Sequence, residues 1–240
     1  MKVLRLKLFQ ETACYKKPYA MKVSETYPLP PFSTVIGMIH YVMGATTPIQ
    51  MKISVQGDYD SLFTDYQKHY FIKKQDTAEF PLVLEGLRED LNSVELKDMT
   101  SMPIYRHLLY RVNLLIHVLA EDSVLEEMYQ SFGANQKVLS LGRAEDLLRI
   151  DCCEIVELVS SEEEVDLLYN AYIPQRFIDE NTSNYIPYRL NSMYEIINHT
   201  RKWEKILVGF MNKGVTFDGE EIDLLIDVID DKEYPVFFYG

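Results

Sequence analysis

Apolar and charged residues alternate at the start of the chain. Leucines occupy every second position from Leu4 to Leu8, and the positions between and beside them hold Val3, Arg5, Lys7 and Phe9. Side chains two residues apart lie on the same face of a β-strand, so this pattern predicts a strand with one buried face. We expect the other face, which carries the basic side chains and the phenylalanine, to be open.

A different spacing follows between residues 33 and 44. Apolar residues recur there at the three- and four-residue intervals of an amphipathic helix, and Gly44 is a suitable residue to end it. Ser33 precedes the apolar stripe and is expected to cap the helix. Residues 51–56 alternate again and lead into Gly57 and Asp58, which predicts a second strand and a turn.

The same order repeats in the middle of the chain. Residues 111–119 alternate and predict a third strand, and Ser123 with Glu126 has the spacing of a capping box. The helix that this box opens is expected to end at Gly133, and residues 152–159 predict a fourth strand. The order strand, helix, strand, strand, helix, strand indicates an α+β domain with the split βαβ arrangement of ferredoxin-like and RNA-recognition folds.

Two stretches do not fit a minimal domain of this kind. Residues 57–103 are too long for a hairpin loop and are expected to fold as a protruding hairpin or helical arm. Tyrosines are frequent after residue 177, which predicts a smaller β-rich C-terminal unit. We therefore expect a modified RNA-recognition-type domain over residues 1–160, with the arm inserted at about 57–103, and a second unit over 161–240.

The charge of the chain is unevenly distributed. Residues 1–111 carry 14 Lys and Arg against 12 Asp and Glu, a net +2, whereas residues 112–240 carry 10 against 25, a net −15, and together these give −13. Phosphate binding is largely electrostatic, so this distribution disfavours binding of nucleic acid along the whole length of the chain. A single basic edge within a larger assembly remains compatible with this distribution.

Several classes of protein are disfavoured. No apolar run approaches the length that spans a bilayer, and the N-terminus lacks the apolar core of a signal peptide, so we expect a cytoplasmic protein. The sequence contains no Walker A motif, no GxGxxG after a strand, no HExxH and no paired CxxC. We therefore expect no cofactor and no structural metal.

Two short motifs have the chemistry to bind RNA. Gly142 and Arg143 stand in a loop between apolar segments, where backbone N–H groups and a guanidinium can meet one phosphate. On what we expect to be the other side of the fold, Tyr27 leads through three prolines into the first helix as a rigid, solvent-facing segment. Nearby, Lys16 and Lys17 follow Tyr15, a combination of aromatic ring and cations that suits a nucleotide.

These features together resemble a known family. A basic strand, the Tyr27-Pro28-Leu29-Pro30-Pro31 segment before an apolar helix, a long arm and the Leu139-Ser140-Leu141-Gly142-Arg143 loop, in that order, look like the CRISPR-associated family-five subunit of type I Cascade. This family belongs to the repeat-associated mysterious protein superfamily. The resemblance covers roughly residues 1–160, and the length and tyrosine content are closest to the subtype I-B branch.

The resemblance implies an antiviral, non-catalytic role. Members bind the 5′ handle of the CRISPR RNA and join the backbone subunits to the large subunit of the surveillance complex, so the chain is not expected to act as a free monomer. The insertion at 57–103 becomes the thumb of the family. The residues expected to contact RNA are Arg5, Lys7, Lys16, Lys17, Tyr27, Arg106, Gly142 and Arg143.

Two alternatives remain open. One branch of the family cleaves repeat RNA without a metal, and general acid–base cleavage needs a group within reach of the ribose 2′-OH. In this chain Tyr105 and His107 would be the catalytic residues of such an endoribonuclease. The second alternative is an architectural protein–protein adaptor without RNA contact, which the acidic second half favours. Arg143→Ala separates the adaptor from an RNA-binding subunit, because only the latter would lose RNA.

Overall fold

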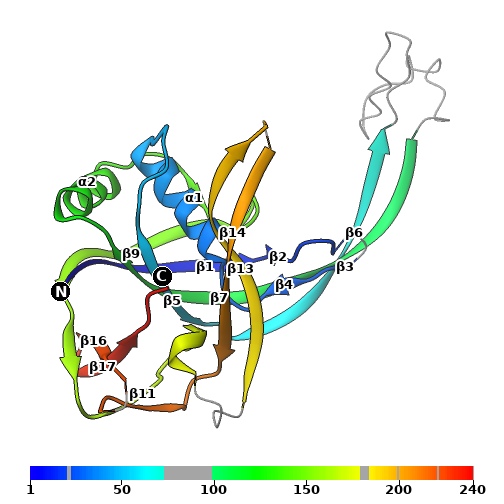
Figure 1. Cartoon of the computed structure of the whole chain (residues 1–240). Coiled ribbons are helices and arrows are strands. Elements are labelled where there is room, and N and C mark those ends of the chain that lie inside the picture. The colour runs from blue at the N-terminus through cyan, green and yellow to red at the C-terminus, as the bar shows by residue number, and fades with distance from the viewer. Residues whose placement is uncertain (21–22, 73–98, 179–183, 199, 221, 240) are drawn as a thin grey trace.

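A computed structural model describes the chain apart from residues 21–22, 73–98, 179–183, 199, 221 and 240 (Figure 1). Within these described residues the largest sheet has ten strands. The four central strands lie side by side in the order β5 (Lys52–Asp58), β7 (Met99–Leu119), β1 (Lys2–Ala13) and β9 (Leu147–Glu157). Each is antiparallel to its neighbour, which is the order of split βαβ units and confirms the predicted α+β fold.

Further strands extend this sheet at both ends. Beyond β5 it continues with β12 (Asn170–Pro174), β14 (Thr200–Met211) and β13 (Tyr185–Ile197), and beyond β9 it ends with β8 (Leu139–Ser140). β3 (Val23–Ser24) and β6 (Ser61–Ile72) also pair with β7. β2 (Tyr15–Lys16) and β4 (Thr26–Tyr27) form a separate short pair beside it.

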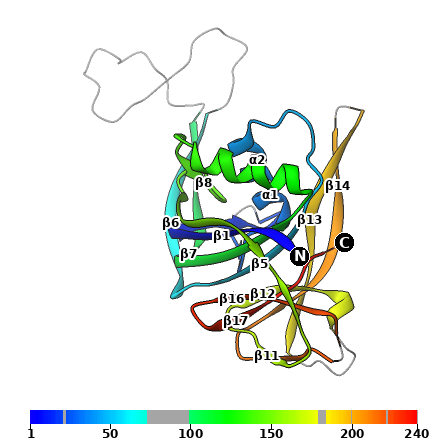
Figure 2. The ribbon, with the colours of Figure 1, turned by 90° about the vertical axis from the view of Figure 1, so that its left-hand side faces the viewer.

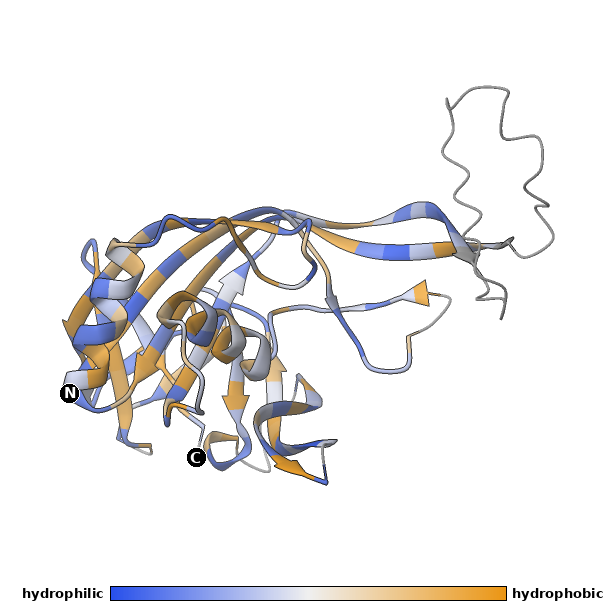
Figure 3. Cartoon of the chain, turned by 90° about the horizontal axis from the view of Figure 1, so that it is seen from above, coloured by the Kyte–Doolittle hydropathy of each residue, from blue (hydrophilic) through white to orange (hydrophobic). Residues whose placement is uncertain are grey.

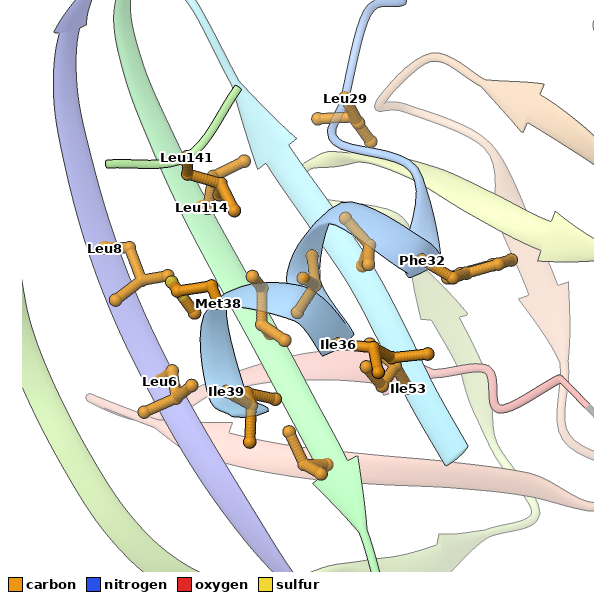
Figure 4. Close-up of a cluster of buried hydrophobic side chains, with 14 of the residues drawn as sticks. Leu6, Leu8, Leu29, Phe32, Ile36, Met38, Ile39, Ile53, Leu114 and Leu141 are labelled. Atoms are coloured by element: carbon orange, nitrogen blue, oxygen red, sulfur yellow. The ribbon is translucent and has the colours of Figure 1, made fainter. Parts of the chain in front are cut away.

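In the described part of the chain, one face of the sheet is covered by two helices. α1 (Phe32–Met43) and α2 (Asp122–Gly133) lie side by side there (Figure 2). Leu6 and Leu8 of β1 face Met38 and Ile39 of α1 across this layer (Figure 4). Removing this apolar surface from water is the main favourable contribution to folding, and it places the leucine face of β1 in the core as predicted. Among the described residues no helix is both long and apolar enough to cross a bilayer.

The predicted helix ends are correct and the predicted helix starts are wrong. Gly44 ends α1 with a left-handed φ of 66°, and α2 ends at Gly133 as expected. No side-chain cap closes either N-terminus, because the N-cap positions are Pro31 and Glu121. Ser123 thus lies inside the first turn of α2 instead of preceding it.

β6 and β7 form an arm that projects from the body of the molecule (Figure 1). They pair without interruption from Ser61 opposite Tyr110 to Ile72 opposite Met99. Hydrophobic and hydrophilic residues alternate along this arm (Figure 3). The predicted arm at 57–103 includes residues 73–98, which lie outside the described residues.

The C-terminal strands form small sheets on the opposite side from the helices (Figure 2). These are β10 (Val159–Ser161) with β16 (Leu224–Ile229) and β17 (Lys232–Val236), and β11 (Glu164–Asp166) with β15 (Thr216–Asp218), while a 3-10 turn, η3 (Gln175–Phe177), follows β12. The division of the chain near residue 160 stays a prediction, and strands after this point contribute to both the main sheet and the small ones.

One expectation about β1 is wrong. We expected the face opposite the leucines to be open, but its N-terminal end is covered by the β16–β17 sheet. Val3 packs against Leu158, Val236 and Phe238, and all four side chains are buried. The N-terminal part of this face therefore serves as a second interior surface.

Candidate nucleic-acid interface

The Gly142–Arg143 loop connects β8 to β9 and lies against the end of β1. Gly142 has a φ of 107°, a backbone conformation that residues other than glycine rarely adopt. A Cβ atom here would lie 2.9 Å from the carbonyl oxygen of Cys14 and 3.0 Å from Oδ2 of Asp146. The close approach of the two backbones therefore requires glycine at this position.

A buried carboxylate organises the loop. Asp146 is fully buried, and its Oδ2 accepts hydrogen bonds from the backbone N–H groups of Cys14 and Arg143, both at 2.9 Å. The Arg143 guanidinium donates to the same carboxylate through Nε at 3.0 Å and Nη2 at 2.5 Å. A buried charge needs such partners to be tolerated. Burial alone lowers the pKa of Arg143, but the hydrogen bond and charge of Asp146 raise it above its ordinary value.

A second layer of buried polar side chains fixes the loop from below. Gln10 of β1 donates from Nε2 to the carbonyl oxygens of Leu141 and Asp146, both at 2.9 Å. Tyr15 donates its hydroxyl to Oε1 of Gln10 at 2.7 Å. All these bonds are buried, so the loop is held in one conformation by contacts far apart in sequence.

Two arginines from different parts of the chain converge at the edge of this loop. Nη1 of Arg143 and Nη1 of Arg106, which lies on β7 at the base of the arm, are 2.8 and 3.0 Å from the same oxygen, Oε1 of Glu145. The arginine side chains are 16% and 13% exposed, whereas Glu145 is 58% exposed. Two guanidinium groups that meet at one anionic oxygen have the geometry to bind a phosphate oxygen, and Glu145 occupies that position in the free chain.

The base of the arm adds an imidazole and two aromatic rings. Nη2 of Arg106 lies 3.5 Å from Nε2 of His69 on the neighbouring strand. Tyr66 and Tyr105, opposite each other in the pairing, pack edge to face with ring centroids 5.5 Å apart. Because side chains alternate along a strand, Tyr105 and His107 lie on the face of β7 opposite Arg106.

The Tyr27 segment lies next to the loop, contrary to our expectation that it occupies another side of the fold. Tyr15, whose ring is 3.4 Å from a Cβ built at Gly142, pairs directly with Tyr27 through β2 and β4. Lys16 is exposed one residue further on. Lys17 donates to Glu25 at 3.3 Å, and its Nζ lies 6.0 Å from the centroid of the Tyr27 ring. Tyr27 itself is half-buried and not solvent-facing as predicted. The two motifs are therefore neighbours in the fold, linked by the buried Tyr15.

Arg5 is held by carboxylates of the protein itself. Its Nη1 donates to both oxygens of the buried Asp227 of β16 at 3.0 and 3.1 Å, and its Nη2 donates to Glu154 of β9. Asp227 also accepts from Nε2 of the buried His117 at 2.9 Å. Lys7 is on the same face of β1 and is partly exposed. Contact of Arg5 and Lys7 with RNA stays a prediction, and for Arg5 a phosphate would have to displace two carboxylates.

Sequence reasoning missed the residues that build the loop. Asp146 and Glu145 are ordinary acidic residues until the fold places them beside Arg143 and Arg106. Gln10 did have a signal: it continues the series Leu4, Leu6, Leu8 and is the first polar residue on the buried face of β1. A polar side chain at such a position needs a buried hydrogen-bond partner.

Comparison with known protein families identifies a match by sequence. The family model described as CRISPR-associated protein (Cas_Cas5) matches residues 3–208, which is most of the chain. No curated protein sequence matches.

Solved structures with similar folds are more distant. A chain described as "CRISPR RNA-guided surveillance complex" is 14% identical, with a TM-score of 0.56 over 89% of this chain and 91% of that chain. A CRISPR protein from Archaeoglobus fulgidus is 8% identical, with a TM-score of 0.47 over 99% of each chain. A third structure, described as a Cas protein, is 12% identical, with a TM-score of 0.46 over 92% and 97%. At these identities the first similarity supports the fold alone.

Proposed function

The chain belongs to the CRISPR-associated Cas5 family, and from this we propose that it is a non-catalytic RNA-binding subunit of a CRISPR surveillance complex. Its ligand is the 5′ handle of the CRISPR RNA, and its protein partners are the backbone and large subunits. Assignment to a type I complex, and within it to subtype I-B, rests only on the sequence resemblance described above.

One observation carries the proposal: Arg106 and Arg143 converge on a single carboxylate oxygen beside Gly142. Neither arginine needs to move far to exchange the exposed carboxylate of Glu145 for a phosphate oxygen. Asp146 holds Arg143 from the buried side, so its position is fixed before RNA arrives. Lys16, Lys17 and Tyr27 lie in the neighbouring segment and are proposed to contact the next nucleotides through charge and ring stacking.

The test is RNA binding by arginine variants of the purified chain. A hydrogen bond to a charged group is worth about 1.5–3 kcal/mol, so Arg106→Ala and Arg143→Ala should each weaken binding of a repeat-derived RNA roughly ten- to hundredfold. Arg189→Ala is the matched control, because Arg189 is an exposed arginine on β13 that lies on the opposite face of that strand from Tyr188, the residue that packs against Tyr27. Equal affinity of the Arg143 and Arg189 variants would favour the adaptor function instead.

A metal-independent endoribonuclease is the second candidate. It is favoured by the placement of Tyr105 and His107 on one face of β7 at the base of the arm, beside Tyr66. Incubation of the protein with repeat RNA in the presence of a chelator tests it directly. Cleavage at one position would establish the enzyme if His107→Ala abolishes it and retains RNA binding. RNA that stays uncleaved would support the non-catalytic binding function instead.

A further inference from the structure

A hollow of about 300 Å³ lies away from the arginine loop, between α1 and the β13–β14 hairpin. Its walls come from the exposed side of α1, from the loop that follows Gly44, and from both strands of the hairpin. Its polar and aromatic side chains include His40, Ser192, Tyr194, Arg201 and Trp203. Two of them already have partners in the protein, since Ser192 donates to Glu204 at 2.7 Å and Nε2 of His40 accepts from the N–H of Ile49 at 3.2 Å. This volume is at the lower end of the range for small-molecule sites.

Aromatic rings and a guanidinium form one wall of the hollow. Tyr194 and Trp203 are cross-strand partners with ring centroids 5.0 Å apart and an angle of 59° between their planes. The guanidinium carbon of Arg201 is 4.6 Å from the Tyr194 ring centroid, a cation–π contact. Arg201 forms no ion pair within the described part of the chain, so its charge is available to a ligand.

The charge around the hollow favours an anionic ligand. No carboxylate is among its described lining residues, and Arg201 is the charged side chain there. The neighbouring hollow of about 470 Å³ shares the aromatic wall but carries two carboxylates, Glu195 and Glu204, against one cation, Lys202, which makes it the poorer site for an anion. Over residues 185–211 the hairpin has four Lys and Arg against two Asp and Glu, a net +2 within a half of the chain that totals −15.

Gly37 keeps the hollow open. It lies in the interior of α1, where glycine destabilises a helix by about 1 kcal/mol relative to alanine. A Cβ atom at this position would meet nothing within 4 Å, so no close packing contact requires glycine here. Since Gly37 lines the hollow, a larger side chain would project into the space where a ligand would lie.

We propose that this hollow binds one nucleotide, with its base against the rings of Trp203 and Tyr194 and its phosphate beside Arg201. Aromatic rings supply stacking surface for any base, and a guanidinium matches a phosphate. The nucleotide is either free or an unpaired unit of an RNA strand, and only the second source rests on the proposed function.

Trp203 is the single tryptophan of the chain, so its emission reports on the aromatic wall that this hollow shares with its neighbour. Gly37 lines this hollow and not the neighbouring one, so a variant at Gly37 assigns the response to one of the two. Two ligands are titrated against it at constant ionic strength: a mixture of nucleoside 5′-monophosphates, and a short single-stranded oligo(A). The expected result is saturable quenching of Trp203 by stacking. If the monophosphates quench Trp203 with the same affinity as oligo(A), the ligand is a free nucleotide. If oligo(A) alone quenches it, the ligand is a unit of an RNA strand.

Three variants make the assignment specific. Gly37→Leu should weaken the quenching titration by about tenfold or more, the scale of one lost base stack, and Arg201→Ala should weaken it less. Gly133→Leu is the control, because a Cβ at Gly133 also meets nothing within 4 Å but lies at the end of α2. The Arg106→Ala, Arg143→Ala double variant should retain the monophosphate response, which separates this site from the arginine loop.

An unchanged Trp203 emission with both ligands would overturn the proposal, whatever the arginine loop binds. Equal quenching in the wild type and in Gly37→Leu would also overturn it, because the base would then stack elsewhere. Loss of oligo(A) binding in the arginine variants, with no Trp203 response in the wild type, would support the proposed function and reject the hollow.

Discussion

Replacing Glu145 by glutamine is expected to tighten RNA binding. In the free chain its Oε1 is the shared partner of Arg106 and Arg143 at 3.0 and 2.8 Å. A phosphate that binds the same guanidinium groups has to displace this carboxylate and lies next to its negative charge. Glutamine has nearly the same shape but carries no charge, so it weakens the competitor for the two guanidinium groups and leaves the loop intact.

The size of the effect follows from the exposure of Glu145. Ion pairs of exposed side chains are worth about 0.2–1 kcal/mol each, and two of them are given up when RNA binds, which makes ~0.4–2 kcal/mol. At about 1.4 kcal/mol per factor of ten, Glu145→Gln should lower the Kd roughly two- to thirtyfold. The gain should shrink at high salt, since screening weakens the same attraction.

Anisotropy of a labelled repeat-derived RNA measures this change. Glu163→Gln is the control, because it removes the same charge from an exposed run of acidic residues. Among the described residues Glu163 forms no ion pair, so this variant isolates the effect of net charge. A Kd for Glu145→Gln equal to that of the control, or a weaker one than wild type, would refute the reasoning that a phosphate replaces the carboxylate.

Three further outcomes concern stability. Gly142→Ala, which forces a side chain into a backbone with φ 107° beside Cys14, should lower the free energy of unfolding by about 1–3 kcal/mol; an unchanged denaturation midpoint would count against the loop geometry. Asp227→Ala leaves Arg5 and His117 without their shared acceptor and should destabilise the chain by about 3–5 kcal/mol in urea, whereas a loss below about 1 kcal/mol would show that the cluster is not buried. Burial holds the pKa of His117 below its ordinary 6.5, so the unfolded chain binds the proton first and stability should fall as the pH drops below about 6.5; His117→Gln should remove that part of the slope, and an unaltered slope would assign it to another group.

Local patterns in the sequence predict most of the fold. The alternation in β1 and the helical spacing of α1 each lie within a dozen residues, and the core uses them as predicted. The capping predictions for Ser33 and Ser123 failed, although the sequence spacing was right, because the backbone enters each helix at an earlier residue. A cap depends on the conformation of one residue, which neighbouring segments decide.

The candidate site is less predictable for a physical reason. Gly142 and Arg143 were visible as a motif, and Arg106 as a basic residue near the arm. Their arrangement depends on contacts such as Gln10 with Leu141, which are 131 residues apart, and on Asp146 beneath the loop. Similarly, nothing local to Arg5 reveals that Asp227, 222 residues later, covers it.

The most direct test of the central claim is the sequence of the RNA that co-purifies with this chain from its native host. The proposed function predicts short RNAs that share one repeat-derived 5′ end, together with partner subunits, and it predicts their loss in the Arg106→Ala, Arg143→Ala double variant but not in Arg189→Ala. Absence of RNA, or RNA without a shared 5′ end, would contradict the claim that this protein holds the handle of a CRISPR RNA.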